Sequence, residues 1–175
     1  MKRIVTATVL NQAGVLNRIT GLFTRRHFNI ESISVGHGET KGVSRMTFTV
    51  NAENEKEIEQ LIKQLNKQID VLKVVDITDQ AMVSRELALI KVGVNPQTRP
   101  EINTLIEPFR CQILDVAKDS QTIEVVGGSD KIEALIELLR PYGIKEMSRT
   151  GVTALPRGMQ KQSSGNGIAQ FAIIK

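Results

Sequence analysis

Few side chains in this sequence are of the types that perform acid–base or nucleophilic catalysis. The two histidines, His27 and His37, fall where a helix end and a loop are expected, and neither has a carboxylate or a nucleophile at a spacing typical of a catalytic pair. His27 is better interpreted as a cation at a helix C-terminus than as a general base. The single cysteine, Cys111, begins a predicted strand without a nearby histidine to activate it, so it is interpreted as a small core residue. We therefore predict no catalytic residue and no metal site.

The remaining polar motifs also have simple structural explanations. The alternating glutamates of residues 53–59 would spread over the exposed side of a helix, where Glu59 can pair with Lys63 four residues later. The glycine-rich phosphate motifs GxxxxGK[ST] and GxGxxG do not occur. The pair Gly127-Gly128 is interpreted as a turn that leads from a strand into a helix.

One turn, Asn11-Gln12-Ala13-Gly14, has the chemistry of a binding site. It leads directly from a predicted strand into a predicted helix, so the first-turn N–H groups of Gly14, Val15 and Leu16 lack partners within the helix. Those N–H groups and the helix dipole attract an anion, and the side-chain oxygen of Asn11 could accept a hydrogen bond from an ammonium group. A zwitterionic α-amino acid carries both charges. The same residues are also an ordinary helix start, and the physical argument alone favours that simpler interpretation.

Hydrophobic periodicity indicates which elements hold this turn in place. Residues 3–10 are rich in Ile, Val and Thr, as strands are, and the helix after the turn has an apolar stripe at Val15, Leu16, Ile19, Leu22 and Phe23. The rest of the first half predicts strands at Phe28–Gly36 and Val43–Val50, a helix around Ile58–Leu65 and a strand at Val71–Thr78. The predicted order is βαββαβ.

The second half repeats this order. It predicts strands at Glu86–Val94, Cys111–Lys118, Gln121–Val126 and Ile144–Gly151, with helices at Arg99–Pro108 and Asp130–Pro141. The fold class is therefore α+β, with two tandem ferredoxin-like domains, each with both helices on one face of an antiparallel sheet. We expect the other sheet face to carry many apolar side chains and to be covered by self-association or by packing of one domain on the other. The predicted boundaries are 1–79 and 86–158, with a linker at 80–85 and a flexible tail at 159–175.

Composition restricts the class of protein further. The chain has 175 residues, of which 41% are hydrophobic and 24% charged, as in an ordinary globular protein. Aromatic residues make up only 3%, which argues against base stacking, and the net charge of +4 is shared evenly by the two halves, so no nucleic-acid role is predicted. Met1-Lys2-Arg3 resembles the start of a signal peptide, but Asn11-Gln12 interrupts the apolar run and no cleavage site follows. With one cysteine and no membrane-spanning run, we expect a cytoplasmic protein.

Several segments carry a family resemblance. They are Leu10–Ile19, Gly21–Phe23, Phe28–Ser32, Ser44–Thr47, Leu65–Val74, Arg85–Lys91, Phe109–Arg110, Ile113–Val116 and Ser148–Gly151. In these segments the chain resembles the regulatory small subunits of acetolactate (acetohydroxyacid) synthase, over about residues 1–158. The segments Asn29–Ser32 and Ser44–Thr47 are more specific to that family than the loop at Asn11.

The resemblance implies an N-terminal ACT domain, a second ferredoxin-like domain and no active site in this chain. The catalytic large subunit, a separate chain, would hold thiamine diphosphate, Mg²⁺ and FAD, and this chain would need no cofactor of its own. The small subunit would raise the activity of the large one and confer feedback inhibition by valine, often with leucine or isoleucine. ACT domains typically form homodimers and bind the effector at the interface. That pattern takes Asn11, Gly14, Val15 and Leu16 from one chain and Asn29 and Ile30 from its neighbour.

A second function class remains open at this stage. A stand-alone amino-acid-binding regulator with two ACT-like domains, acting on transcription, would have the same repeated topology. The absence of a helix-turn-helix pattern or a concentrated basic helix counts against it. The sequence does not rank valine, leucine and isoleucine as effectors, and it does not give the stoichiometry with a large subunit.

Overall fold

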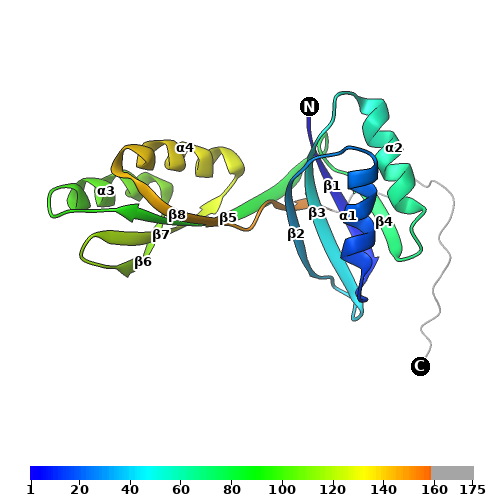
Figure 1. Cartoon of the computed structure of the whole chain (residues 1–175), viewed down its shortest axis with the longest axis horizontal. Coiled ribbons are helices and arrows are strands. Elements are labelled where there is room, and N and C mark those ends of the chain that lie inside the picture. The colour runs from blue at the N-terminus through cyan, green and yellow to red at the C-terminus, as the bar shows by residue number, and fades with distance from the viewer. Residues whose placement is uncertain (159–175) are drawn as a thin grey trace.

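The computed structural model describes residues 1–158, which form two α+β domains joined end to end in an elongated molecule (Figure 1). The first domain contains β1 (Lys2–Leu10), α1 (Val15–Arg25), β2 (Ile30–His37), β3 (Val43–Asn51), α2 (Glu55–Asn66) and β4 (Val71–Asp76). The second contains β5 (Met82–Gly93), α3 (Thr98–Ile106), β6 (Gln112–Val116), β7 (Ser120–Gly127), α4 (Ser129–Leu139) and β8 (Ile144–Arg149), followed by β9 (Thr153–Pro156). Short 3₁₀ helices at Glu107–Phe109 and Arg140–Tyr142 extend α3 and α4. The predicted tail at 159–175 lies outside the described residues.

Both domains have the predicted βαββαβ order and the ferredoxin-like strand arrangement. The first sheet has the order β2-β3-β1-β4 and the second β6-β7-β5-β8, and the pairings between neighbouring strands are antiparallel. In each domain the two helices cover the same face of the sheet (Figure 1). The predicted fold class is therefore confirmed, and most element ends lie within two residues of their predicted positions.

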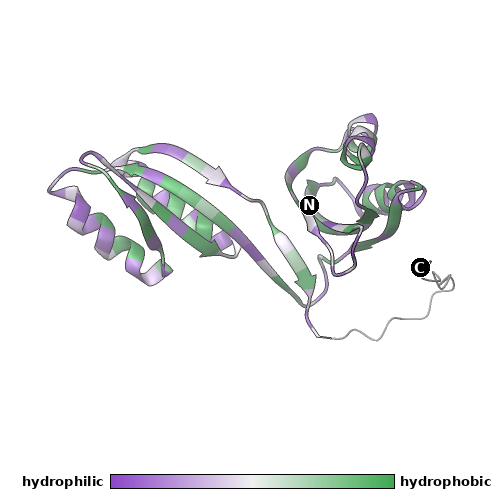
Figure 2. Cartoon of the chain, turned by 90° about the horizontal axis from the view of Figure 1, so that it is seen from below, coloured by the Kyte–Doolittle hydropathy of each residue, from purple (hydrophilic) through white to green (hydrophobic). Residues whose placement is uncertain are grey.

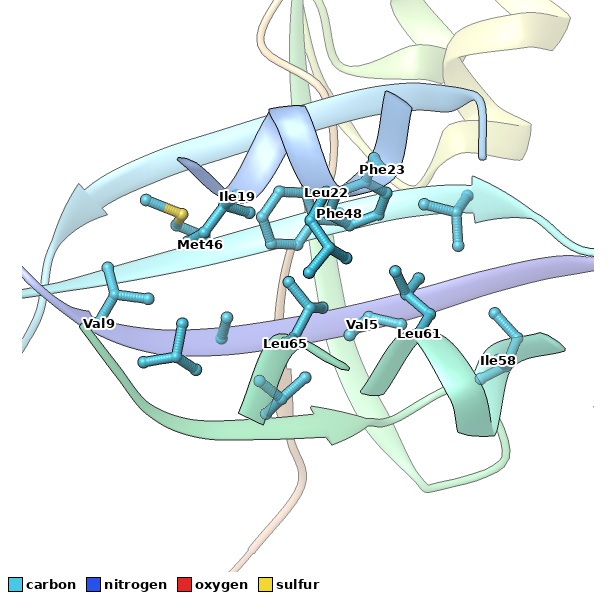
Figure 3. Close-up of a cluster of buried hydrophobic side chains, with 14 of the residues drawn as sticks. Val5, Val9, Ile19, Leu22, Phe23, Met46, Phe48, Ile58, Leu61 and Leu65 are labelled. Carbon is cyan, nitrogen blue, oxygen red and sulfur yellow. The ribbon is translucent and has the colours of Figure 1, made fainter. Parts of the chain in front are cut away.

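The core of the first domain lies between its sheet and its two helices. Phe23 of α1 and Phe48 of β3 lie at its centre with ring centroids 5.0 Å apart (Figure 3). Val5 and Val9 of β1 and Leu65 of α2 surround them, each fully buried. Burial of a large apolar side chain contributes about 1.5–3 kcal/mol, so this cluster holds α1 firmly on the sheet and thereby positions both of its ends.

The outer face of the first sheet differs from our prediction of an apolar surface. Successive strand residues point to opposite faces, so Ile4 and Thr6, which flank the core-facing Val5 in the chain, lie on the outer side. Thr6 lies opposite Thr47, and Ile4 lies opposite Thr49, in the antiparallel register of β1 and β3. This face is therefore rich in hydroxyl groups, because β-branched threonine suits a strand as well as valine does.

A short strand that the sequence analysis missed covers part of this outer face. β9 pairs antiparallel with the start of β5, from Met82 opposite Pro156 to Arg85 opposite Thr153. Val152 and Ala154 of this returning segment form a separate buried cluster with Ile77, against which Ile4, Val75 and Met82 pack. Residues 82–85, which we assigned to the linker, are thus part of a twelve-residue strand. Two chain segments, one entering and one leaving the second domain, span the space between the domains (Figure 2).

Candidate functional site

The turn between β1 and α1 has the geometry of an uncapped helix start. The N-cap residue is Gly14, which adopts a left-handed conformation with φ 82°, and no side chain caps the helix. The backbone N–H of Asn11 donates to the carbonyl of Gly42, which ties the turn to the β2–β3 hairpin. One of the N–H groups that we expected to lack a partner has one, because the Val15 N–H donates a hydrogen bond to the Gln12 carbonyl at 3.3 Å. The positive φ explains why glycine occupies position 14.

Two residues that the sequence analysis did not assign complete this corner. A β carbon at Gly14 would lie 3.1 Å from Nη1 of Arg18, one turn further along α1. Arg18 is held in place by Asp70, whose Oδ2 accepts from Nε at 2.8 Å and lies 2.6 Å from Nη2. Asp70 is itself 7% exposed and precedes β4. A fixed guanidinium edge therefore stands beside the start of α1. The four-residue spacing from Gly14 to Arg18 was visible in the sequence, whereas the position of Asp70 depends on the sheet.

The two apolar residues that follow the turn, at the start of α1, have different environments. Val15 is 3% exposed and belongs to the core, as the apolar stripe predicted. Leu16 is 45% exposed, so its placement in that stripe was wrong. Position 16 is 100° around the helix from position 15, which turns its side chain away from the sheet. An exposed leucine next to the turn supplies apolar surface for a ligand or a neighbouring chain.

The six predicted site residues do not come together within one chain. Asn11, Gly14, Val15 and Leu16 lie at the start of α1, whereas Asn29 and Ile30 lie beyond its end, at the start of β2. An eleven-residue helix is about 16 Å long, which separates the two groups. Asn11 and Asn29 are both exposed, and Asn11 Nδ2 lies 3.5 Å from Nδ1 of His37. A single site containing all six residues requires a second copy of the chain.

The other chemical candidates have structural roles. The Asn54 side chain accepts from the Glu57 N–H and caps α2, and Glu59 pairs with Lys63 on the exposed face of that helix. Cys111 packs against the second core, and burial raises the pKa of its thiol. Within residues 1–158, no three His, Cys, Asp or Glu side chains are grouped so that they could hold a metal ion. No helix in the same range is long and apolar enough to cross a membrane.

The βαββαβ topology places both domains in the ferredoxin-like class, and the comparisons with known proteins identify the first as an ACT domain. Residues 6–73 match the family model described as "AHAS small subunit-like ACT domain", and residues 85–158 match the model "Small subunit of acetolactate synthase". The chain belongs to the family of acetolactate synthase small subunits.

Individual relatives cover nearly the whole chain. The acetolactate synthase small subunit of Bacillus subtilis is 67% identical over 166 residues, which are 95% of this chain and 96% of that protein. The probable acetolactate synthase small subunit of Archaeoglobus fulgidus is 50% identical, over 92% of this chain and 100% of that protein. The crystal structure of the Thermotoga maritima small subunit has a TM-score of 0.83 at 39% identity, covering 91% of this chain and 99% of that one.

Proposed function

We propose that this chain is the regulatory subunit of an acetolactate synthase. It binds a catalytic large subunit, raises that subunit's activity and transmits feedback inhibition by valine or a related branched-chain amino acid. The observation that carries the proposal is the pairing of family membership over both domains with an open, uncapped helix start in the first domain. The large subunit would hold thiamine diphosphate, Mg²⁺ and FAD, and the assembly would work in the cytoplasm.

The start of α1 offers a complementary group for each part of an amino-acid effector. The N–H groups of the first turn and the positive end of the helix dipole suit the effector's carboxylate. Nη1 of Arg18 stands on the same side, 3.1 Å from where a β carbon of Gly14 would be. The side-chain oxygen of Asn11 would accept from the ammonium group, and Leu16 would contact the aliphatic part.

The second half of the pocket would come from a neighbouring copy. A homodimer with its first domains side by side would bring Asn29 and Ile30 of one chain to the α1 start of the other. The separation of the two groups within one chain supports this arrangement, as does the exposure of Asn29 and of Leu16, which is 45% exposed. An effector that bridges two chains stabilises the dimer by mass action.

Reconstitution with a large subunit tests the proposal. Co-purification of the two chains is expected, together with a rise in acetolactate formation when this chain is added and a fall when valine follows. Direct calorimetry should show valine binding to the isolated chain. If the chain neither binds nor activates a large subunit yet binds valine, the stand-alone regulator is correct and the subunit assignment is wrong.

A further inference from the structure

The segment that returns from the second domain lies directly on strand β2 of the first. The hydroxyl groups of Ser34 and Thr153 are 2.8 Å apart, and the Val152 N–H donates to Ser32 Oγ at 3.5 Å. Gly151 approaches so closely that a β carbon there would lie 2.9 Å from the β carbon of Ser32. β2 begins at Ile30, two residues before Ser32. The proposed effector site and the interdomain contact are therefore on the same strand.

The chain on one side of Gly151 is fixed to the second domain. Arg149 donates to both carboxylate oxygens of Glu86, from Nε at 2.6 Å and from Nη2 at 3.1 Å, and its Nη1 donates to Glu133 at 2.6 Å. Glu86 belongs to β5 and is 5% exposed, and Ser129 also donates to it. The hydrogen bonds to Glu86 and Glu133 raise the pKa of Arg149 above its ordinary value. A bidentate pair of this kind fixes the end of β8 in one geometry.

The chain on the other side of Gly151 is fixed to the first domain. Val152 and Ala154 are 6% and 1% exposed and pack with Ile77 below the first sheet. Gly151 itself has φ 76°, a conformation that L-residues rarely adopt. Within this returning segment, Gly151 is thus the joint between the part anchored in the second domain and the part anchored in the first.

A cavity beside this joint leaves room for the domains to shift. It has a volume of about 440 Å³ and is lined from both sides, by Ser32 and Thr49 of the first domain and by Glu86, Glu133 and Arg149 of the second. The hydroxyl of Thr49 is buried there without a hydrogen-bond partner. On this side the domains are therefore separated by an open pocket, and the contact at Gly151 lies at its edge.

We propose that the contact of Ser32 and Ser34 with Gly151–Thr153 carries the effector signal from the first domain to the second. An effector that contacts Ile30 at the start of β2 shifts Ser32. Because Ser32 contacts Gly151, this shift displaces Gly151 and, through Arg149, the end of β8. The inference rests on the proposed function, since it concerns the response to the same amino acid. It predicts that a variant without this contact still binds the effector but is no longer inhibited by it. Such a variant has lost the free energy of coupling between the two sites.

Two glycine variants test this, both at positions with positive φ, and only one of them lies at the contact. Gly151→Ala drives a β carbon into Ser32, whereas Gly143→Ala, at φ 84°, meets no atom within 4 Å. Gly151 has φ 76°, and Gly143 has φ 84° and ψ 94°, so each variant places a β carbon on a residue with positive φ, but only Gly151→Ala disturbs the contact with Ser32. We expect Gly151→Ala to bind valine as the wild type does, by calorimetry on the isolated chain, and to activate the large subunit. The valine concentration for half-inhibition of the reconstituted enzyme should rise at least fivefold, toward the upper end of typical couplings at about 150-fold. Gly143→Ala should respond like the wild type.

A double-mutant cycle on the hydroxyl groups of Ser34 and Thr153 gives an independent measurement that does not depend on backbone strain. Ser34→Ala and Thr153→Val each remove one partner of the same hydrogen bond, so the double variant should raise the half-inhibition concentration no more than either single one.

The outcomes separate the two proposals. Unchanged half-inhibition in both Gly151→Ala and the double hydroxyl variant overturns the inference and leaves the proposed function standing. Equal loss in Gly151→Ala and Gly143→Ala also overturns it, because strain alone would then explain the effect. A wild-type assembly that responds to none of valine, leucine and isoleucine overturns the proposed function, and the inference with it.

Discussion

Arg18 and Asp70 are joined across the corner where α1 meets the sheet, with Nη2 of Arg18 2.6 Å from Oδ2 of Asp70. Asp70 also fixes β1, because its backbone carbonyl accepts from the Leu10 N–H at 2.8 Å. One residue therefore holds both the guanidinium beside Gly14 and the end of the strand that leads into the turn. This relationship makes the position of the candidate anion site a property of the packed domain rather than of the turn alone.

Removing the charge of Asp70 should cost stability and weaken effector binding. Asp70→Asn leaves a buried amide against the guanidinium, and the lost charged hydrogen bonds should lower the free energy of unfolding by about 1–2 kcal/mol, since Arg18 is half exposed to screening solvent. Urea unfolding measures the first effect and calorimetry with valine the second. Glu59→Gln is the control, because Glu59 pairs with Lys63 at 3.4 Å on an exposed helix face and should change stability by less than about 0.5 kcal/mol. Equal stability of the two variants would contradict the role of Asp70.

Placing a carboxylate at Gly14 should abolish the effector response. In Gly14→Asp the new side chain enters the space beside Nη1 of Arg18 and pairs with the group that the effector's carboxylate would use. The half-inhibition concentration for valine should rise about 5–150-fold in the reconstituted enzyme, with activation largely retained. Gly14→Asn has the same shape without the charge and also tolerates a left-handed backbone. Its effect should be smaller, and an unchanged response to valine in Gly14→Asp would refute the site.

Mixing two variants that bind valine weakly tests whether the pocket is shared between chains. Asn11→Ala and Asn29→Ala should each weaken valine binding, because a polar effector group left unpaired in a closed pocket costs about 1–3 kcal/mol. In a mixed dimer one of the two pockets is rebuilt from intact halves. After full exchange of an equal mixture about half of the dimers are mixed, so about a quarter of all sites should regain high affinity by calorimetry. Failure to recover any such site, with subunit exchange confirmed by mass spectrometry, would show that one chain supplies both residues or that they do not share a pocket.

Deletion of residues 159–175 should leave valine affinity unchanged. The proposed effector residues lie between positions 11 and 30, and the last described residues are held by their own contacts. The Arg157 N–H donates to the Ala81 carbonyl at 2.7 Å, and its Nε donates to the Met82 carbonyl at 3.1 Å. A several-fold loss of affinity in the truncated chain would place the tail in the effector site, whereas loss of activation alone would indicate docking on the large subunit.

Cys111 should react slowly with alkylating reagents. Burial against the second core disfavours its thiolate and raises the pKa of the thiol, so less thiolate is present at pH 8 than in a free cysteine. The rate of iodoacetamide modification should increase with pH around a midpoint above about 8.5, the ordinary cysteine value. A midpoint below that value would instead indicate an activated thiol.

The periodicity of apolar residues determined the fold class and the order of elements. Val5, Ile19 and Leu65 follow the strand and helix repeats that decide which face is buried, and this local rule operates in any tertiary context. The resemblance to the acetolactate synthase small subunits was likewise carried by short segments of sequence, and the whole-chain comparisons confirm it. The candidate site was predicted in part, since the glycine turn before α1 is a local signal.

Only the tertiary structure decided what stands around that turn and between the domains. The sequence does not show that Asp70 meets Arg18, because they are 52 residues apart and are brought together by the pairing of β4 with β1. It also gave no sign of β9, whose four residues have little periodicity and form a strand only because β5 extends past its own sheet to pair with them. Leu16 was assigned to the core because its neighbours are apolar, but the docking of α1 on the sheet turned it to the surface. In each case the result depends on contacts between residues that are distant in the chain. The local sequence pattern does not predict such contacts.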